Sequence, residues 1–252
     1  MPLSDFQAAL GAKIRGGGTA ATDDAGLRFT MHVQRSWCRG RAAKGARLTL
    51  SILDVDVRQR LLDTWVAAGG GTASVLTAEA DAFLDFIASH LPAPSHALTI
   101  CRLEQATLRA SEGTATFSPR AAAAVSAVAA QSSRRDGRSV RVEIGRYAAL
   151  VDFHADPDRL LAELAAIGSV STALPPVTAE PVVSILFAPG LDDLSRVATA
   201  DEIALWNRLR TQAPLPSPVN ALLDEGHALE TIDALAAVGA IEMSLATAAL
   251  RA

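Results

Sequence analysis

The spacing of apolar residues changes about half-way along this chain, and this change constrains the fold more than any other feature of the sequence. Before residue 111, apolar side chains recur every three to four residues, as they do on one face of a helix. Residues 139–153, SVRVEIGRYAALVDF, have the spacing of half-buried strands instead. We therefore predict an α+β protein, with a helical bundle in its N-terminal part and a sheet in its C-terminal part.

Four helices are predicted in the N-terminal part. Their expected bounds are residues 4–14, 54–68, 78–91 and 95–110. The last of these carries apolar residues around most of its circumference, so we expect it to lie at the centre of the bundle. Its charged residues Arg102 and Glu104 then need partners, because an unpaired buried charge is costly. We favour a structural salt bridge for them over exposure at an interface.

A low-complexity segment rich in alanine and serine separates the two parts. We place a helical domain at residues 1–113, a linker at 114–137 and a second domain at 138–252. The second domain should begin with a hairpin over residues 139–153 that turns near Gly145.

The rest of the second domain is predicted to contain two more strands and four helices. The expected elements are a helix over residues 157–167 capped by Asp156, a strand over 182–187, helices that begin at Thr199, Ser217 and Gly226, and a strand over 240–243. Three strands followed by three helices and a closing strand is a winged-helix-like order.

Charge is distributed unevenly along the chain. The formal net charge is -4, but residues 1–50 carry a balance of +5 and the residues from 191 onward a balance of -5. Such a split can steer association with a partner of mixed charge, or it can reflect two ordinary solvated faces. No apolar stretch reaches the roughly 18 residues of a membrane span, and the first residues lack the apolar core of a secretory signal. We therefore expect a cytoplasmic protein with no membrane partner.

A winged helix first suggests DNA binding, in which the third helix contacts the major groove. Here that helix, residues 226–238, contains no Arg or Lys, and Glu230 and Asp233 would repel phosphate groups. The sequence therefore argues against a nucleic-acid partner, and a DNA-binding transcriptional regulator is the alternative function.

The same fold can bind an extended peptide as an added strand, in the groove between the third strand and the third helix. Backbone hydrogen bonds would supply affinity, and apolar pockets would set the register. The candidate peptide-binding residues are Val183, Ile185 and Phe187 on the strand, and Leu229, Ile232 and Leu235 on the helix. Each of them can instead belong to the core, because alternate strand positions must face inward.

Catalytic signals are weak. Gly69 to Gly71 end a helix and lack the GK[ST] that completes a phosphate-binding loop. His154 lies near Asp152 and Asp156, but Asp156 is better explained as a helix cap than as a metal ligand. Cys38 stands in a basic setting that can lower a thiol pKa, yet no base can be assigned to it, so a buried or interface cysteine is the favoured interpretation and a thiol enzyme a third one. We expect no catalytic residue, no metal site and no cofactor in this chain.

Several segments resemble one family of proteins. They are WCRGRAAKGARLTLSIL (37–53), LLDTWVAAGGGTASVL (61–76), LPAPSHALTICRLEQATLRA (91–110), ALVDFHADPDRLL (149–161) and LFAPGLDDL (186–194). These segments are similar to the partner subunits of multinuclear non-heme iron peptide-modifying oxidases. The family includes partner proteins of 3-thiaglutamate-type pathways and, more distantly, the partner protein of methanobactin synthesis. The methanobactin partner has a C-R-L-E-Q stretch like residues 101–105.

The resemblance implies a specific function. The helical domain would dock on an iron-dependent oxidase to form a heterodimer, and the iron would belong to that other subunit. The C-terminal domain would be a recognition element for the leader of a ribosomally made precursor peptide. The residues expected at the partner interface are Trp37, Arg39, Arg41, Arg102 and Glu104.

Overall fold

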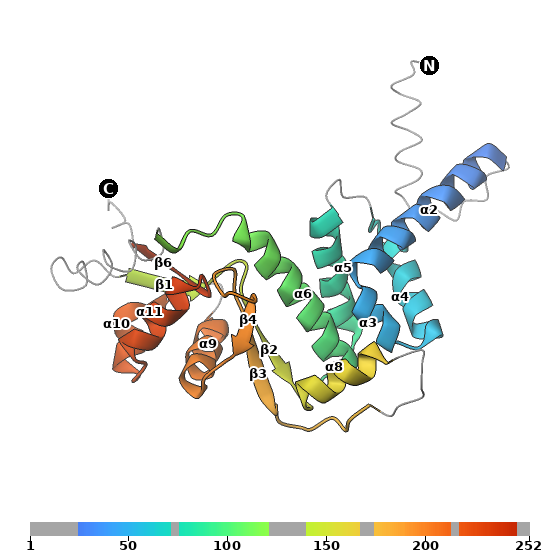
Figure 1. Cartoon of the computed structure of the whole chain (residues 1–252). Coiled ribbons are helices and arrows are strands. Elements are labelled where there is room, and N and C mark those ends of the chain that lie inside the picture. Colours follow the sequence, from blue (N-terminus) through green and yellow to red (C-terminus); the bar gives the residue numbers. More distant parts are fainter. Residues whose placement is uncertain (1–24, 72–75, 121–139, 167–173, 213–216, 246–252) are drawn as a thin grey trace, which may run out of the picture. The chain divides into compact units, whose positions relative to one another are not determined.

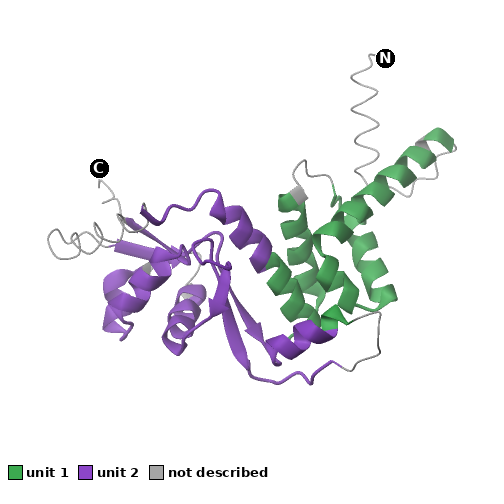
Figure 2. Cartoon of the chain, viewed as in Figure 1, with its two compact units in different colours: residues 1–105, 164–172 green, residues 106–163, 173–252 purple. Residues whose placement is uncertain are grey.

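The computed structural model describes residues 25–71, 76–120, 140–166, 174–212 and 217–245. It confirms the α+β class, with helices first and small antiparallel sheets and helices after them (Figure 1). Two compact units divide the chain (Figure 2): the N-terminal unit holds residues 1–105 and 164–172, and the C-terminal unit holds residues 106–163 and 173–252. The helix expected at 4–14, and residues 121–137 of the expected linker, lie outside the described residues.

Helices build the N-terminal unit. They are α2 (Ala25–Gly45), α3 (Arg47–Ile52), α4 (Val55–Ala67), α5 (Leu76–His90) and the beginning of α6 (His96–Thr114). The last three confirm the predicted helices, with bounds that differ by a few residues. The fully buried side chains of Phe83 and Leu84 on α5 and Ile100 on α6 belong to the core of this unit. Trp65 packs against Phe83, with ring centroids 5.4 Å apart.

Helices α2 and α3 are not among the sequence predictions. The burial pattern of α2 explains why its sequence does not predict a helix. Cys38 and Ala42 on its inner face are buried, whereas Phe29, Val33 and Trp37 are exposed. Because apolar side chains occupy both faces of α2, its sequence lacks the single apolar stripe that identifies an amphipathic helix.

The C-terminal unit contains two antiparallel sheets of three strands. One has the order β5 (Ser217–Pro218), β1 (Val140–Ile144) and β6 (Ile241–Leu245). The other has the order β2 (Ala149–Phe153), β3 (Val183–Phe187) and β4 (Ser195–Val197). The described helices of this unit include the end of α6, α8 (Pro157–Ala165), α9 (Ala200–Gln212), α10 (Val219–Asp224) and α11 (Leu229–Ala237).

The predicted hairpin over residues 139–153 is wrong, although both of its strands exist. Strand β1 pairs with β5 and β6, and β2 pairs with β3. The backbone N–H of Gly145 donates to the carbonyl of Ala240 at 2.9 Å, and a Cβ at Gly145 would lie 2.4 Å from the carbonyl oxygen of Gly239. The chain is therefore held against β6 at the expected turn, and it continues into the other sheet instead of folding back.

The C-terminal unit has a winged-helix-like arrangement. Its elements follow in the order α9, β5, α10, α11 and β6, and β1 is the central strand between β5 and β6. One apolar core joins these elements. Its members include Val142 on β1, Leu205 on α9, Leu222 on α10, Ile232 and Leu235 on α11, and Ile241 on β6, all at most 2% exposed.

Local capping explains where α8 and α9 begin. The N–H of Arg159 donates to Asp156 Oδ1 at 2.8 Å, which confirms Asp156 as the cap of α8. At α9, the N–H of Thr199 donates to Glu202 Oε2 at 2.9 Å, and the N–H of Glu202 donates to Thr199 Oγ1 at 3.3 Å. This reciprocal pair is a capping box.

Candidate interaction surfaces

The six candidate peptide-binding residues do not form one groove. Leu186 packs in the core that contains Ile232 and Leu235 of α11. Successive strand residues point to opposite faces of a sheet. Val183, Ile185 and Phe187 therefore face away from α11.

The expected binding edge also needs correction, because β3 is a central strand. It pairs with β2 from Val183 to Phe187 and with β4 from Ile185 to Phe187. An added strand cannot pair with β3 while both neighbours are in place. On α11, Ile232 and Leu235 are fully buried in the core, and Leu229 is 39% exposed. A role of these six residues in peptide binding stays a prediction.

Strand β4 offers an edge that the sequence prediction missed. Among the described strands, only β3 pairs with β4. Two backbone hydrogen bonds flank the paired residues Leu186 and Arg196. The Ala188 N–H donates to the Leu194 carbonyl, and the Ala198 N–H donates to the Ser184 carbonyl. Backbone groups alternate in direction along an antiparallel strand, so those of Ser195 and Val197 point away from β3. The Val197 side chain is 62% exposed.

An ion pair holds this edge strand to α9. Arg196 contacts both carboxylate oxygens of Glu202, with Nη1 2.8 Å from Oε2. Glu202 is 6% exposed, and its remaining partner is the Thr199 N–H. The hydrogen bonds from Arg196 hold the pKa of Glu202 below its usual value.

We expect Glu202→Gln to lower the free energy of unfolding of the C-terminal unit by about 2 kcal/mol near neutral pH, because the variant removes the carboxylate charge that balances Arg196. Because the pKa of Glu202 is lowered in the folded state, the stabilisation by its carboxylate is complete at pH values above the ordinary carboxyl pKa. This stabilisation is lost as the pH falls through the folded-state pKa. Denaturant unfolding from pH 7 to pH 3 should therefore show the two proteins converging on acidification. A constant difference across this range would contradict the assignment, and exposed Asp201→Asn on the same helix is the control.

The expected partner-interface residues on α2 have different environments. Trp37 is 52% exposed, and the Arg41 guanidinium lies 4.5 Å from its ring centroid. Arg41 Nη2 is also 2.7 Å from Oε2 of the buried Glu79 on α5. Arg39 forms an ion pair with Asp63 on α4. Trp37 is thus the most exposed of these side chains.

The two expected interface residues on α6 are engaged within the N-terminal unit. Arg102 Nη1 lies 3.3 Å from Asp85 Oδ1 and donates to Gln105 Oε1 at 2.7 Å. Glu104 accepts hydrogen bonds from the Leu48 N–H at 2.7 Å, the Thr49 N–H at 2.8 Å and Thr49 Oγ1 at 2.6 Å. Arg102 therefore has a salt-bridge partner in Asp85, whereas Glu104 caps the N-terminus of α3. Their expected role at a partner interface stays a prediction.

The two cysteines have buried thiols. Cys38 Sγ donates to the Gly71 carbonyl at 3.2 Å, and Cys101 Sγ donates to the Leu84 carbonyl at 3.1 Å. Burial raises the pKa of Cys38, and it raises the pKa of Cys101 to about 11. Both thiols therefore stay protonated at neutral pH, which disfavours a nucleophilic role.

His154 and Asp152 each have a hydrogen-bonding partner in the structure. The His154 ring contacts the Thr178 carbonyl through Nδ1 at 3.0 Å, and Asp152 accepts a hydrogen bond from Ser184 Oγ at 2.6 Å. Within the described ranges, no three His, Cys, Asp or Glu side chains are placed to hold a metal ion. In the same ranges, no helix is both long and apolar enough to cross a membrane.

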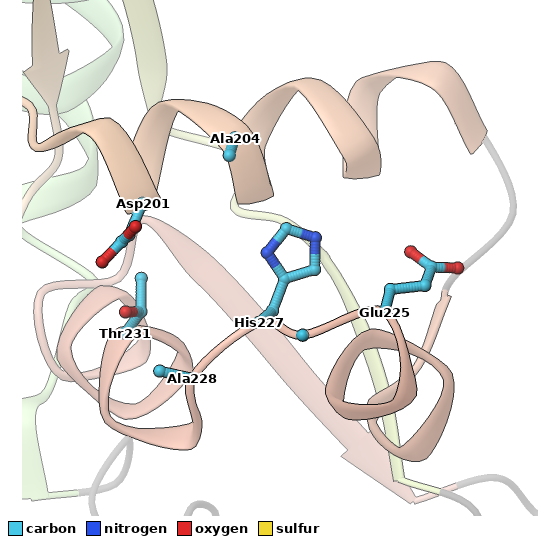
Figure 3. A pocket seen from close by; sticks show the side chains of 7 residues that line it. Asp201, Ala204, Glu225, His227, Ala228 and Thr231 are labelled. Atoms are coloured by element: carbon cyan, nitrogen blue, oxygen red, sulfur yellow. The ribbon is translucent and has the colours of Figure 1, made fainter.

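A pocket of about 280 Å³ lies between the start of α9, the loop after α10 and the start of α11 (Figure 3). The Asp201 carboxylate and the Thr231 hydroxyl lie at one end of it, and Glu225 lies at the other end (Figure 3). An ion pair with Arg208 lowers the pKa of Glu225, so this carboxylate is charged at neutral pH. The pocket adds to the acidic character of this side of the unit.

Comparison with known proteins finds no family model that matches this sequence, and no curated protein that matches it.

Proposed function

We propose that this chain is a non-catalytic partner protein in the modification of a ribosomally made peptide. It forms a heterodimer with a multinuclear iron-dependent oxidase in the cytoplasm and binds the leader of the precursor peptide. The iron belongs to the other subunit. The family resemblance of the segments at 37–53, 61–76, 91–110, 149–161 and 186–194 supports this assignment.

One structural observation carries the peptide-binding part of the proposal. The C-terminal unit combines a winged-helix-like arrangement with a strand edge at β4 that no described strand covers. Its third helix, α11, contains no Arg or Lys and exposes Glu230. Such a helix repels a phosphate backbone, whereas an open strand edge suits an extended peptide.

The leader would bind along β4 as a fourth strand of the sheet β2-β3-β4. The outward backbone groups of Ser195 and the N–H of Val197 would supply the main-chain hydrogen bonds. The Val197 carbonyl accepts a bond from Arg196 Nη1 at 3.1 Å, so it would exchange this partner for a backbone N–H of the peptide. The acidic balance of the residues from 191 onward favours a leader segment that carries basic residues.

Binding the leader would raise the reaction rate without any catalytic group in this chain. A precursor held on the heterodimer brings its reacting residue to the metal at high effective concentration. Such tethering would let a partner protein that supplies no catalytic group be required for product formation.

We expect Val197→Asp to weaken precursor binding at least tenfold, because the added carboxylate disrupts the edge and opposes strand addition. The measurement is fluorescence anisotropy of a labelled precursor titrated with the protein. Val182→Asp is the matched control, since Val182 is similarly exposed (56%) and lies just before β3 instead of on β4. Equal affinities for Val197→Asp and the wild type would exclude β4 as the binding edge.

A further inference from the structure

Three large apolar side chains on α2 remain exposed on one face of the helix. Phe29, Val33 and Trp37 follow one another at intervals of four residues, which places them in one row. They are 69%, 48% and 52% exposed. A row of exposed apolar side chains on an otherwise packed helix marks an interaction site. We call Phe29, Val33 and Trp37 the outer row of α2.

The outer row lies opposite the face through which α2 packs in its own unit. Cys38 and Ala42, on the inner face, are 3% and 0% exposed. Gly40 extends the outer face without adding a side chain, and among the described residues no atom lies within 4 Å of where its Cβ would be. The outer row is therefore available to another molecule, and Gly40 leaves room for close approach beside it.

Trp37 is held in position although it is exposed. The Arg41 guanidinium stacks over its ring at 4.5 Å, and Arg41 is held in turn by Glu79, which is 2% exposed. Fixing the tryptophan before binding lowers the entropy that an interface must overcome. Tryptophan and arginine are also the residue types most enriched among those that dominate binding energy.

The charge of α2 indicates what kind of partner fits. The helix carries five cations and no carboxylate: Arg28, Arg35, Arg39, Arg41 and Lys44. Asp63 and Glu79 balance two of them, Arg39 and Arg41, so an excess of three positive charges is left on the helix. A symmetric dimer through this face would bring two such helices together and would be opposed by like-charge repulsion. A partner with carboxylates around an apolar groove is complementary to it.

A membrane surface fits this face less well. The outer row is one residue wide, and Ser36 and Lys44 are exposed on the same side of the helix. Helices that lie in a bilayer interface bury a broad apolar face. A narrow row with polar neighbours matches a groove on a protein instead.

We propose that the outer row of α2 is the docking surface for a partner protein that presents an apolar groove bordered by carboxylates. This inference rests on the proposed function in taking that partner to be the iron-dependent oxidase. Phe29 and Trp37 are the principal contacts, Arg41 positions Trp37, and Lys44 pairs with the acidic border.

The test measures binding of the purified oxidase subunit by isothermal titration calorimetry. We expect Phe29→Asp and Trp37→Ala each to weaken binding at least thirtyfold, the loss typical of a dominant interface residue. Val55→Asp is the matched control, because Val55 is 65% exposed and lies on α4. Thermal unfolding of each variant checks folding, and Phe29→Asp decides the result if Trp37→Ala unfolds.

The outcomes separate this inference from the proposed function. If the wild type binds the oxidase and Phe29→Asp binds equally well, the docking surface is wrong and the heterodimer stands. If the wild type does not bind the oxidase, both fail. If the wild type binds vesicles of phosphatidylglycerol and Phe29→Asp does not, the outer row binds a membrane and the inference is overturned. If the wild type forms a homodimer and Phe29→Asp does not, the outer row binds a second copy and the inference is likewise overturned.

Discussion

Leu235→Asp is expected to unfold the C-terminal unit. Leu235 on α11 is fully buried, in one core cluster with Ile232 and Leu222. Removing a core leucine side chain costs about 2–5 kcal/mol, and burying an unpaired carboxylate adds to this loss. The sum is comparable with the whole stability of a typical domain, about 5–15 kcal/mol.

Circular dichroism and thermal unfolding measure this effect. Leu229→Asp is the matched control, because Leu229 is on the same helix and 39% exposed. It should fold like the wild type. A Leu235→Asp protein with the wild-type melting temperature would contradict the core placement of α11. Because this variant is expected to unfold, weak peptide binding by it would not identify Leu235 as a peptide contact.

Glu104→Ala is expected to destabilise the N-terminal unit by about 2–4 kcal/mol. The Glu104 carboxylate accepts three hydrogen bonds at the start of α3, two of them from the N–H groups of Leu48 and Thr49. Ala46, the N-cap residue of α3, has no side-chain acceptor that could replace it. A negative charge at this end also interacts favourably with the helix dipole.

Urea unfolding followed by tryptophan fluorescence tests this prediction, since Trp65 lies in the N-terminal unit. Glu112→Ala provides the control, because Glu112 is an exposed carboxylate on the same helix. If both variants unfold at the same urea concentration as the wild type, Glu104 does not cap α3. In that case its side chain is available for the partner interface expected from the sequence.

Local signals predicted many of the elements. The helices α4, α5 and α6 follow from apolar periodicity and from breaks at glycine and proline, and Thr199 and Asp156 mark the beginnings of α9 and α8. The strand β3 follows from its run of apolar and β-branched residues. Such signals lie within a few residues of the element that they specify.

Long-range pairing could not be predicted in the same way. Val142 of β1 pairs with Ser217 and with Met243, and nothing near Val142 in the sequence encodes partners so distant. The strand β4 has only three residues, too few to show an alternating pattern. The edges of a sheet depend on these pairings. The sequence predicts β3 as the binding strand, whereas β3 is the central strand of its sheet and β4 is an edge strand.

Residue roles depended on the same long-range information. Glu104 lies beside the start of α3 only in the folded chain, and Trp37 gains its positioning contact from Arg41. The exposure of Phe29 and Val33 became evident only when α2 was seen to pack through its opposite face.

We propose that this chain supplies no catalytic group and that an iron-dependent oxidase requires it to modify a precursor peptide. The most direct measurement incubates the purified, iron-loaded oxidase and the precursor with and without this chain and follows the peptide mass over time. We predict product only when this chain is present, and none from this chain and the precursor alone. Product formed at the same rate without this chain would contradict the account.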